Sequence, residues 1–344
     1  MVHYTSSGLD GDIVNRGDFN NDGIPDLVVG NNEGTSGYGI SVLLGKGDGR
    51  FQKALNSGTG VGTFAMTVGD FNGDGKLDVA VTGYVSDEQN VIQILLGKGD
   101  GTFTIGQSIN LPINTSSRSL TTGDFNGDGK LDLALASQQL LIYKGAGNGT
   151  FTQAASITVG SQNDLAQVLV GDFNGDGKPD LSVSDYYNLY ALINTGNFTF
   201  KTVKLASAAD GIFGVPVDMN QDGFSDLLVS YYTCSTIKSV SCPNWEVLLG
   251  SASGTFTKSA GMTLSSEITF YGVTAADING DGINDILGLS SYALMIYLGN
   301  PDGSYQSTPF LVPNSGLDDL VAADFNRDGK LDFAGPGPGN PANL

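Results

Sequence analysis

A nine-residue acidic pattern recurs seven times in the 344-residue chain, and this repetition constrains the fold more than any other feature. The pattern reads DFNGDGKLD at residues 70–78 and again at 124–132. Its copies begin 46 to 59 residues apart, at Asp18, Asp70, Asp124, Asp172, Asp218, Asp277 and Asp324. Such a period is typical of repeat architectures, in which each unit buries its apolar face against its neighbours.

A second pattern recurs between the acidic ones. It reads LLGKGDGRF from Leu43, LLGKGDGTF from Leu95 and LLGSASGTF from Leu248. An apolar run, a Gly-rich turn and an aromatic residue predict a strand, a tight hairpin and a returning strand. Two more strands flank each acidic pattern, and no stretch of comparable length has the period of a helix with caps.

Each repeat therefore contains four short strands. A four-stranded meander repeated about every 50 residues predicts a β-propeller, which fits better than a β-helix because β-helix repeats are much shorter. Seven copies predict an all-β, seven-bladed propeller of antiparallel blades, with residues 1–344 forming a single domain. The seventh repeat lacks the Gly-rich hairpin, so we expect residues 2–5 to supply its outer strand; alternatively, the chain is a fragment.

The charge of the chain excludes two classes of partner. The 36 Asp and Glu residues outnumber the 16 Lys and Arg residues, giving a formal net charge of −20. Nucleic acids and anionic membrane surfaces both require clustered basic residues, so neither is predicted as a partner. No segment approaches the roughly 18 apolar residues of a membrane span. The seven acidic patterns hold 21 of the 36 acidic residues, which leaves the remainder of the chain nearly neutral.

The D-x-N-x-D-G-x-x-D pattern between two strands resembles the FG-GAP or VCBS repeats of bacterial secreted proteins and the propeller of integrin α chains. It is also similar to certain fungal sugar-binding lectins that are built as seven-bladed propellers. The resemblance covers essentially the whole chain. It implies a calcium-binding propeller that is secreted or displayed at the cell surface, but fold likeness alone does not specify the function.

The acidic patterns are candidate calcium-binding loops. Oxygen ligands at positions one, three, five and nine, with Gly turning the chain at position six, suit a cation that accepts six to eight oxygens. The carbonyl at position seven completes each set, and the Asp at position nine replaces the Glu at position twelve of an EF-hand. Up to seven calcium ions are expected, on Asp18, Asn20, Asp22, Ile24 and Asp26; Asp70, Asn72, Asp74, Lys76 and Asp78; Asp124, Asn126, Asp128, Lys130 and Asp132; Asp172, Asn174, Asp176, Lys178 and Asp180; Asp218, Asn220, Asp222, Phe224 and Asp226; Asp277, Asn279, Asp281, Ile283 and Asp285; and Asp324, Asn326, Asp328, Lys330 and Asp332. The alternative is that these residues form turns by bonding their own backbone, as Asp and Asn often do.

Strand order predicts where a ligand would bind. In a four-stranded meander the acidic loop and the Gly-rich hairpin lie at one end of the blade, and the longer, variable loops lie at the other. Binding residues concentrate on loops held by a rigid scaffold, so we expect the ligand at the variable end. The candidates are Tyr38, Tyr84, Tyr186, Tyr187, Tyr231, Tyr232 and Trp245, with Glu33, Asp87, Glu88 and Asp185 as polar neighbours. The alternative is that these aromatic residues pack between blades.

The sequence favours binding over catalysis. The only histidine is His3, so a Ser-His-Asp arrangement and a His-rich zinc site are not predicted. Acidic residues outside the repeats are too scattered to nominate a pair for glycoside cleavage. We therefore expect a non-enzymatic adhesion or ligand-binding module for an extracellular protein or glycan, either monomeric or part of a larger surface protein. The alternatives are a carbohydrate-binding lectin and a polysaccharide lyase or hydrolase domain.

The two cysteines, Cys234 and Cys242, lie in the longest loop between predicted strands. A disulfide closing that loop is the simplest interpretation, and it predicts an oxidising, extracellular or cell-surface location. The alternative is two free thiols. No signal peptide is visible, because Met1 and Val2 lead directly into polar sequence.

Overall fold

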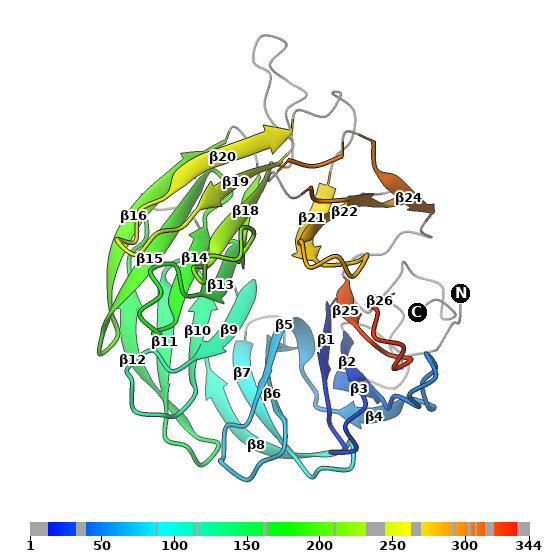
Figure 1. The fold of residues 1–344 in the computed structure, drawn as a ribbon. Coiled ribbons are helices and arrows are strands. Elements are labelled where there is room, and N and C mark those ends of the chain that lie inside the picture. The colour runs from blue at the N-terminus through cyan, green and yellow to red at the C-terminus, as the bar shows by residue number, and fades with distance from the viewer. Residues whose placement is uncertain are drawn as a thin grey trace.

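The computed structural model describes residues 13–31, 39–86, 89–112, 115, 117–160, 164–208, 211–231, 245–262, 270–290, 293–300, 304–306, 308–313 and 320–335. The described chain forms antiparallel sheets arranged around a central opening (Figure 1). In each four-stranded sheet the strands follow one another in sequence order, as in a meander. In the described residues no helix is long and apolar enough to cross a membrane.

Six four-stranded blades are present in this part of the chain. The first three contain β1 (Ile13–Gly17), β2 (Asp26–Asn31), β3 (Gly39–Leu43) and β4 (Leu55–Gly58); β5 (Gly62–Gly69), β6 (Asp78–Ser86), β7 (Gln89–Gly97) and β8 (Phe103–Asn110); and β9 (Ser119–Gly123), β10 (Asp132–Ala136), β11 (Leu140–Gly145) and β12 (Phe151–Ile157). The next three contain β13 (Gln167–Gly171), β14 (Asp180–Ser184), β15 (Asn188–Gly196) and β16 (Thr199–Ser207); β17 (Ile212–Val217), β18 (Asp226–Tyr231), β19 (Trp245–Leu249) and β20 (Thr257–Met262); and β21 (Phe270–Ala276), β22 (Asp285–Ser290), β23 (Ala293–Tyr297) and β24 (Phe310–Pro313).

The prediction of seven four-stranded blades is wrong. The seventh acidic pattern joins only two described strands, β25 (Val321–Ala323) and β26 (Asp332–Ala334), which form a two-stranded sheet. The acidic pattern specifies only the two strands that flank it, and the residues after 335 lie outside the described part of the chain. Residues 2–5, expected to complete this sheet, lie outside the described residues.

The hydrophobic core lies between neighbouring blades. Every residue of β2, β10 and β14 is buried, because a middle strand of a blade is covered on both of its faces. Val28 and Val42 of the first blade, for example, share one apolar cluster with Met66, Val79 and Val81 of the second. The outermost strands show the alternation of a half-exposed strand, as in β4.

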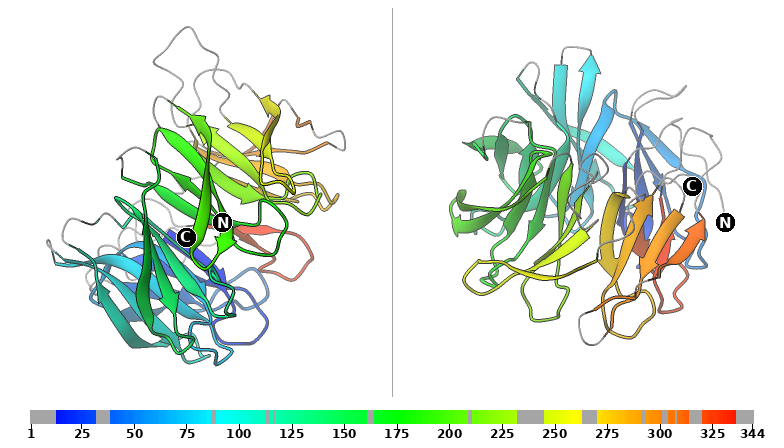
Figure 2. Two further views of the ribbon diagram at one scale, coloured as in Figure 1. Left: turned by 90° about the vertical axis from the view of Figure 1, so that its left-hand side faces the viewer. Right: turned by 90° about the horizontal axis from the view of Figure 1, so that it is seen from above.

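A repeated contact joins each of several blades to the repeat before it. The N–H of Gly149, in the hairpin of the third blade, donates to the carbonyl of Phe71 in the acidic loop of the second at 2.8 Å. The N–H of Gly49, in the first blade, donates in the same way to the carbonyl of Phe325 in the seventh repeat at 3.1 Å. The beginning and the end of the described chain lie side by side (Figure 2). The two-stranded sheet therefore takes the place of a blade between the sixth and the first.

Candidate functional site

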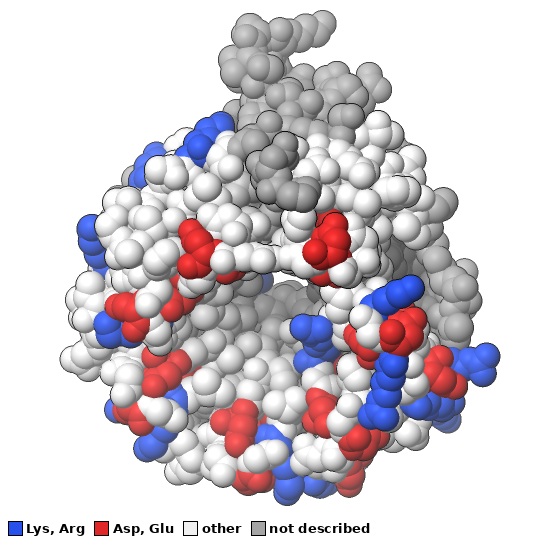
Figure 3. All heavy atoms as spheres, viewed as in Figure 1, with Lys and Arg blue, Asp and Glu red and all other residues white. Residues whose placement is uncertain are grey.

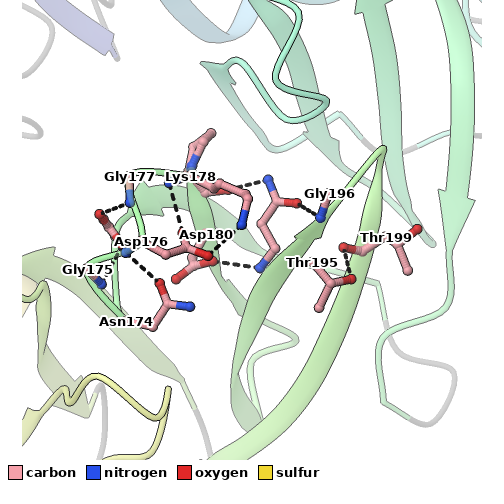
Figure 4. Close-up of polar contacts among 12 residues, drawn as sticks. Asn174, Gly175, Asp176, Gly177, Lys178, Asp180, Thr195, Gly196 and Thr199 are labelled. Carbon is pink, nitrogen blue, oxygen red and sulfur yellow. Dashed lines mark hydrogen bonds and ion pairs between the residues drawn. The ribbon is translucent and has the colours of Figure 1, made fainter.

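The acidic loops are folded by their own side chains, as the fourth loop illustrates (Figure 4). The Asp172 carboxylate accepts the N–H groups of Asp176 at 3.2 Å and of Gly177 at 2.9 Å. The side-chain oxygen of Asn174 also accepts the Asp176 N–H, and Asp176 accepts the N–H of Lys178. Gly177 has a φ of 77°, in the left-handed region that glycine adopts without strain. The polar side chains thus curl toward the backbone of the loop.

The ninth position of each loop has a distinct role. Asp132 is fully buried, and its two carboxylate oxygens accept the N–H of Phe125 at 3.0 Å and that of Gly145 at 2.9 Å. Phe125 belongs to the acidic loop and Gly145 to the hairpin of the same blade. A Cβ at Gly145 would lie 2.0 Å from the carbonyl oxygen of Leu131, so only glycine fits there. The same pair of bonds is made by Asp26, Asp78, Asp132, Asp180, Asp226 and Asp285.

Burial changes the acidity of these carboxyl groups. It raises the pKa of Asp26, Asp132 and Asp180 to about 6, although the two backbone N–H groups that each one accepts act in the opposite direction. The neighbouring carboxylates of the same loop raise these pKa values further. The buried carboxyl groups therefore favour the protonated form more than an exposed Asp does.

We expect the free energy of unfolding, measured in chelator, to be higher at pH 5 than at pH 7. The folded-state pKa of these three groups is about 6, above the ordinary Asp value of 3.8. Between pH 3.8 and about pH 6 the folded chain therefore binds more protons than the unfolded chain. The stability that these protons contribute is lost as the pH rises through about 6. Exposed Asp100, whose hydrogen bonds with Thr102 lower its pKa, acts in the opposite sense but is screened by solvent. Urea unfolding at both pH values tests this, and greater stability at pH 7 would contradict it.

The donor set of the loops fits calcium in its chemistry. It consists of carboxylate and amide oxygens, and the N–H of Asp22 donates to both Asp18 and Asn20, so these oxygens surround one point of the loop. Ion pairs with lysine reach only three loops among the described residues, at Asp74, Asp128 and Asp176. However, no three or more His, Cys, Asp or Glu side chains of the described chain are gathered as a metal site requires. Calcium binding by these loops therefore remains a prediction.

The acidic loops share one face of the propeller. Asp and Glu side chains surround the central opening on the face shown in Figure 3. The meander order of the strands places the acidic loop and the Gly-rich hairpin of each blade at the same end, as strand parity predicts. We call this the acidic-loop face, and we call the opposite face, which carries the loops within and between blades, the variable-loop face.

A cavity of about 470 Å³ opens on the variable-loop face. Its lining residues belong to the second to fifth blades and gather near the starts of the inner strands β5, β9, β13 and β17, which surround the central opening (Figure 1). We call it the axial cavity, and it is lined by Phe64, Asn90, Ser117, Arg118, Ala166, Tyr186 and Phe213. Sequence reasoning identified only Tyr186 of this set, because the others stand singly in links and strand ends that no repeated pattern marks.

Three predicted ligand-binding residues lie at or beside this cavity. Tyr186 is 36 % exposed and lines it, whereas Tyr187 is 48 % exposed but does not. The ring of Tyr84 contacts the ring of Phe64 at a centroid distance of 5.3 Å. Asp185 is buried, and its carboxylate accepts the N–H groups of the turn that follows, including that of Tyr187. Asp185 therefore shapes the turn instead of facing a ligand.

The other aromatic candidates lie elsewhere. Trp245 is only 1 % exposed, and its ring meets that of Tyr305 edge-to-face at 5.1 Å, so it belongs to the core between the fifth and sixth blades. Tyr231 is partly buried, and its hydroxyl donates to Glu246 within the fifth blade. The remaining candidates lie outside the described residues: Glu33, Tyr38, Asp87, Glu88, Tyr232 and the cysteines Cys234 and Cys242.

Known proteins share both the repeats and the fold. The model of the FG-GAP-like repeat matches residues 18–81, 83–135, 130–183, 172–229, 218–288 and 277–334, and that of the FG-GAP repeat matches residues 62–101. A T-cell immunomodulatory protein homolog of Plasmodium falciparum (isolate 3D7) is 33 % identical over 132 residues. That match covers 34 % of this chain and only 18 % of the relative.

Several solved structures have a similar fold at low sequence identity. A lectin of Agrocybe aegerita that recognises non-reducing terminal N-acetylglucosamine is 15 % identical, with a TM-score of 0.61 over 96 % of this chain and 86 % of that one. BBS1N in complex with ARL6DN is 13 % identical, with a TM-score of 0.63 over 100 % and 99 % of the two chains. A periplasmic gluconolactonase of Pseudomonas aeruginosa is 14 % identical, with a TM-score of 0.58 over 84 % and 82 %. These likenesses establish the fold alone, whereas the repeat matches span almost the whole chain and show that it belongs to the FG-GAP-like repeat family.

Proposed function

We propose that this chain is an extracellular, calcium-stabilised module that binds its ligand on the variable-loop face. The observation that carries the proposal is the axial cavity, where aromatic side chains remain exposed at the centre of that face. A concave site with aromatic walls and a few polar groups is the usual form of a small-ligand site. The acidic loops on the opposite face hold the scaffold together and would bind up to seven calcium ions.

The difference in regularity between the loops of the two faces supports this proposal. On the acidic-loop face, side-chain oxygens are engaged by backbone N–H groups in the same way in successive blades. Such uniformity suits a structural role. The variable-loop face differs from blade to blade, and binding residues are commonly displayed on irregular loops above a rigid scaffold.

A lectin is the second candidate function. The exposed rings of Phe64 and Tyr186 are the kind of side chain that stacks on the apolar face of a sugar. The likeness to a lectin that recognises N-acetylglucosamine adds support at the level of the fold. The first candidate, an adhesion module, would instead take an extracellular protein segment at the same place.

Binding assays on the purified chain test the proposal and separate the two candidates. In saturating calcium we expect the chain to capture a defined glycan or an extracellular protein, and Phe64→Ala to weaken that capture by about tenfold, as for loss of a buried anchor. A glycan array supports the lectin, and capture of a protein without bound glycan supports the adhesion module. The proposal is contradicted if Phe64→Ala leaves binding unchanged and a substitution on the acidic-loop face abolishes it. The ligand would then bind to the acidic-loop face. Incubation with plant and microbial polysaccharides should release no products.

A further inference from the structure

The axial cavity presents aromatic surface to solvent. Phe64 is 38 % exposed and Tyr186 is 36 % exposed, whereas many large aromatic side chains of the described chain are buried. Phe213 meets the ring of Tyr186 edge-on at a centroid distance of 6.2 Å. The backbone of Tyr186 has a φ of 69°, a left-handed conformation that is costly for a bulky side chain. The turn therefore holds a tyrosine where Gly or Asn would be less strained.

A positive charge lies beside these rings. The Nη1 of Arg118 donates to the Tyr186 hydroxyl at 3.2 Å, and the guanidinium carbon lies 5.8 Å from the centroid of the Tyr186 ring. A guanidinium has five N–H donors, so this bond leaves most of them available. None of the ion pairs among the described residues includes Arg118, and none of the described lining residues is acidic. In a chain of net charge −20, this is a local site for a negative group.

A buried hydroxyl completes the set of polar groups. Ser117 lines the cavity, is 2 % exposed, and its Oγ has no hydrogen-bond partner among the described residues. The Thr82 hydroxyl donates to the carbonyl of Ser117 at 3.0 Å and holds that residue in place. A buried hydroxyl without a partner costs free energy, which a ligand hydroxyl would recover.

From these contacts we infer that the axial cavity binds an acidic sugar residue, with Arg118 on its carboxylate, Tyr186 and Phe64 against its ring, and Ser117 on a ring hydroxyl. The inference rests on the proposed ligand-binding role of this face and adds the chemical class of the ligand. A uronic acid carries a carboxylate, an apolar ring face and hydroxyl groups on one rigid unit. The cavity, at about 470 Å³, is within the usual range for small-ligand sites. An acidic peptide would meet Arg118 but offers no flat ring face for the two aromatic residues.

Calorimetric titration with tri-galacturonate and with its methyl-esterified form, both in saturating calcium, tests the inference. The two ligands differ only in their carboxyl groups. We expect the acid to bind about tenfold or more tightly than the ester, because a guanidinium–carboxylate pair is charge-assisted. Poly-glutamate serves as the peptide alternative.

Three variants locate the site. Arg118→Gln should weaken binding of the acid by about tenfold or more and remove the preference over the ester. Tyr186→Asn should weaken both ligands while leaving the fold intact, because Asn adopts a left-handed φ readily. Tyr187→Ala is the matched control, since Tyr187 is exposed but does not line the cavity. The affinity of this variant for tri-galacturonate should stay within about twofold of that of the unaltered chain. Equal melting temperatures establish that each variant is folded.

Equal affinity for acid and ester, binding unaffected by Arg118→Gln, or binding of poly-glutamate without tri-galacturonate would each overturn the inference. Failure of the inference is distinguishable from failure of the proposed function. If tri-galacturonate does not bind but another glycan or a protein binds in a Phe64-dependent way, only the inference fails. If no ligand binds in a way that depends on this face, both fail.

Discussion

Removal of calcium is expected to lower the melting temperature of this chain on the order of 10 °C. Each loop carries three carboxylates, and extracellular sites of this kind hold calcium at roughly 0.1–1 mM. In 10 mM calcium a site of about 1 mM affinity stabilises the folded chain by about 1.4 kcal/mol, because the ion binds the folded state only. Seven such sites give about 10 kcal/mol, which for a chain of this size corresponds to a shift on the order of 10 °C.

Scanning calorimetry in calcium and in EDTA measures this shift. Magnesium at the same ionic strength is the control, since it demands a near-ideal octahedral site and screens charge without filling a flexible loop. Seven bound ions would also change the formal charge from −20 to about −6, by the charge of the ions, so electrophoretic mobility gives a second readout. An identical melting temperature in calcium and EDTA would refute structural calcium and leave the loops as turns closed by their own backbone.

Phe71→Ala is expected to lower the free energy of unfolding by about 3–5 kcal/mol, the usual cost of deleting a buried phenyl ring. Phe71 is 2 % exposed, and its ring meets that of Phe151 in the next blade edge-to-face at 5.5 Å. Urea unfolding of the single and double variants with Phe151→Ala should give a coupling of about 0.5–1.5 kcal/mol for this pair. Phe310→Ala, at a side chain that is 58 % exposed, is the control and should change stability little. A loss at Phe71 no larger than at Phe310 would show that the joint between blades is not held by this pair.

Much of the fold follows from the sequence, because repetition makes local patterns unambiguous. The acidic pattern and the hairpin pattern each predict a turn between two strands, and six repeats form four-stranded meanders accordingly. For the seventh repeat the described residues form only the two strands that flank its acidic pattern. Counting acidic patterns gave too many blades, because the acidic pattern specifies only the first two strands of each.

The candidate site was less predictable. Tyr186 could be nominated as an aromatic residue near a strand end, but Trp245 could be nominated for the same reason and is buried. What separates them is tertiary: Tyr186 follows β14 in a turn near the central opening, whereas Trp245 begins a middle strand between two blades. Arg118 and Ser117 occupy a link between blades, and only the ring arrangement brings them beside Tyr186. The bond between Asp132 and Gly145, which joins the loop to the hairpin, was also not predicted, because the sequence suggested either metal ligands or bonds within the loop itself.

The described part of the seventh repeat contacts both of its neighbouring blades. Its Phe325 ring meets that of Phe51 at 5.3 Å, so the seam with the first blade has the same aromatic joint as the complete blades. At the seam with the sixth blade the repeat contributes Leu320 and Phe333 to a small apolar cluster, with no hairpin from its own described strands. Among the described residues, the Phe325–Phe51 ring pair thus joins the seventh repeat to the first blade, and Leu320 and Phe333 join it to the sixth. The two ends of the described chain are therefore held together by side-chain packing as well as by the backbone hydrogen bond from Gly49 to Phe325.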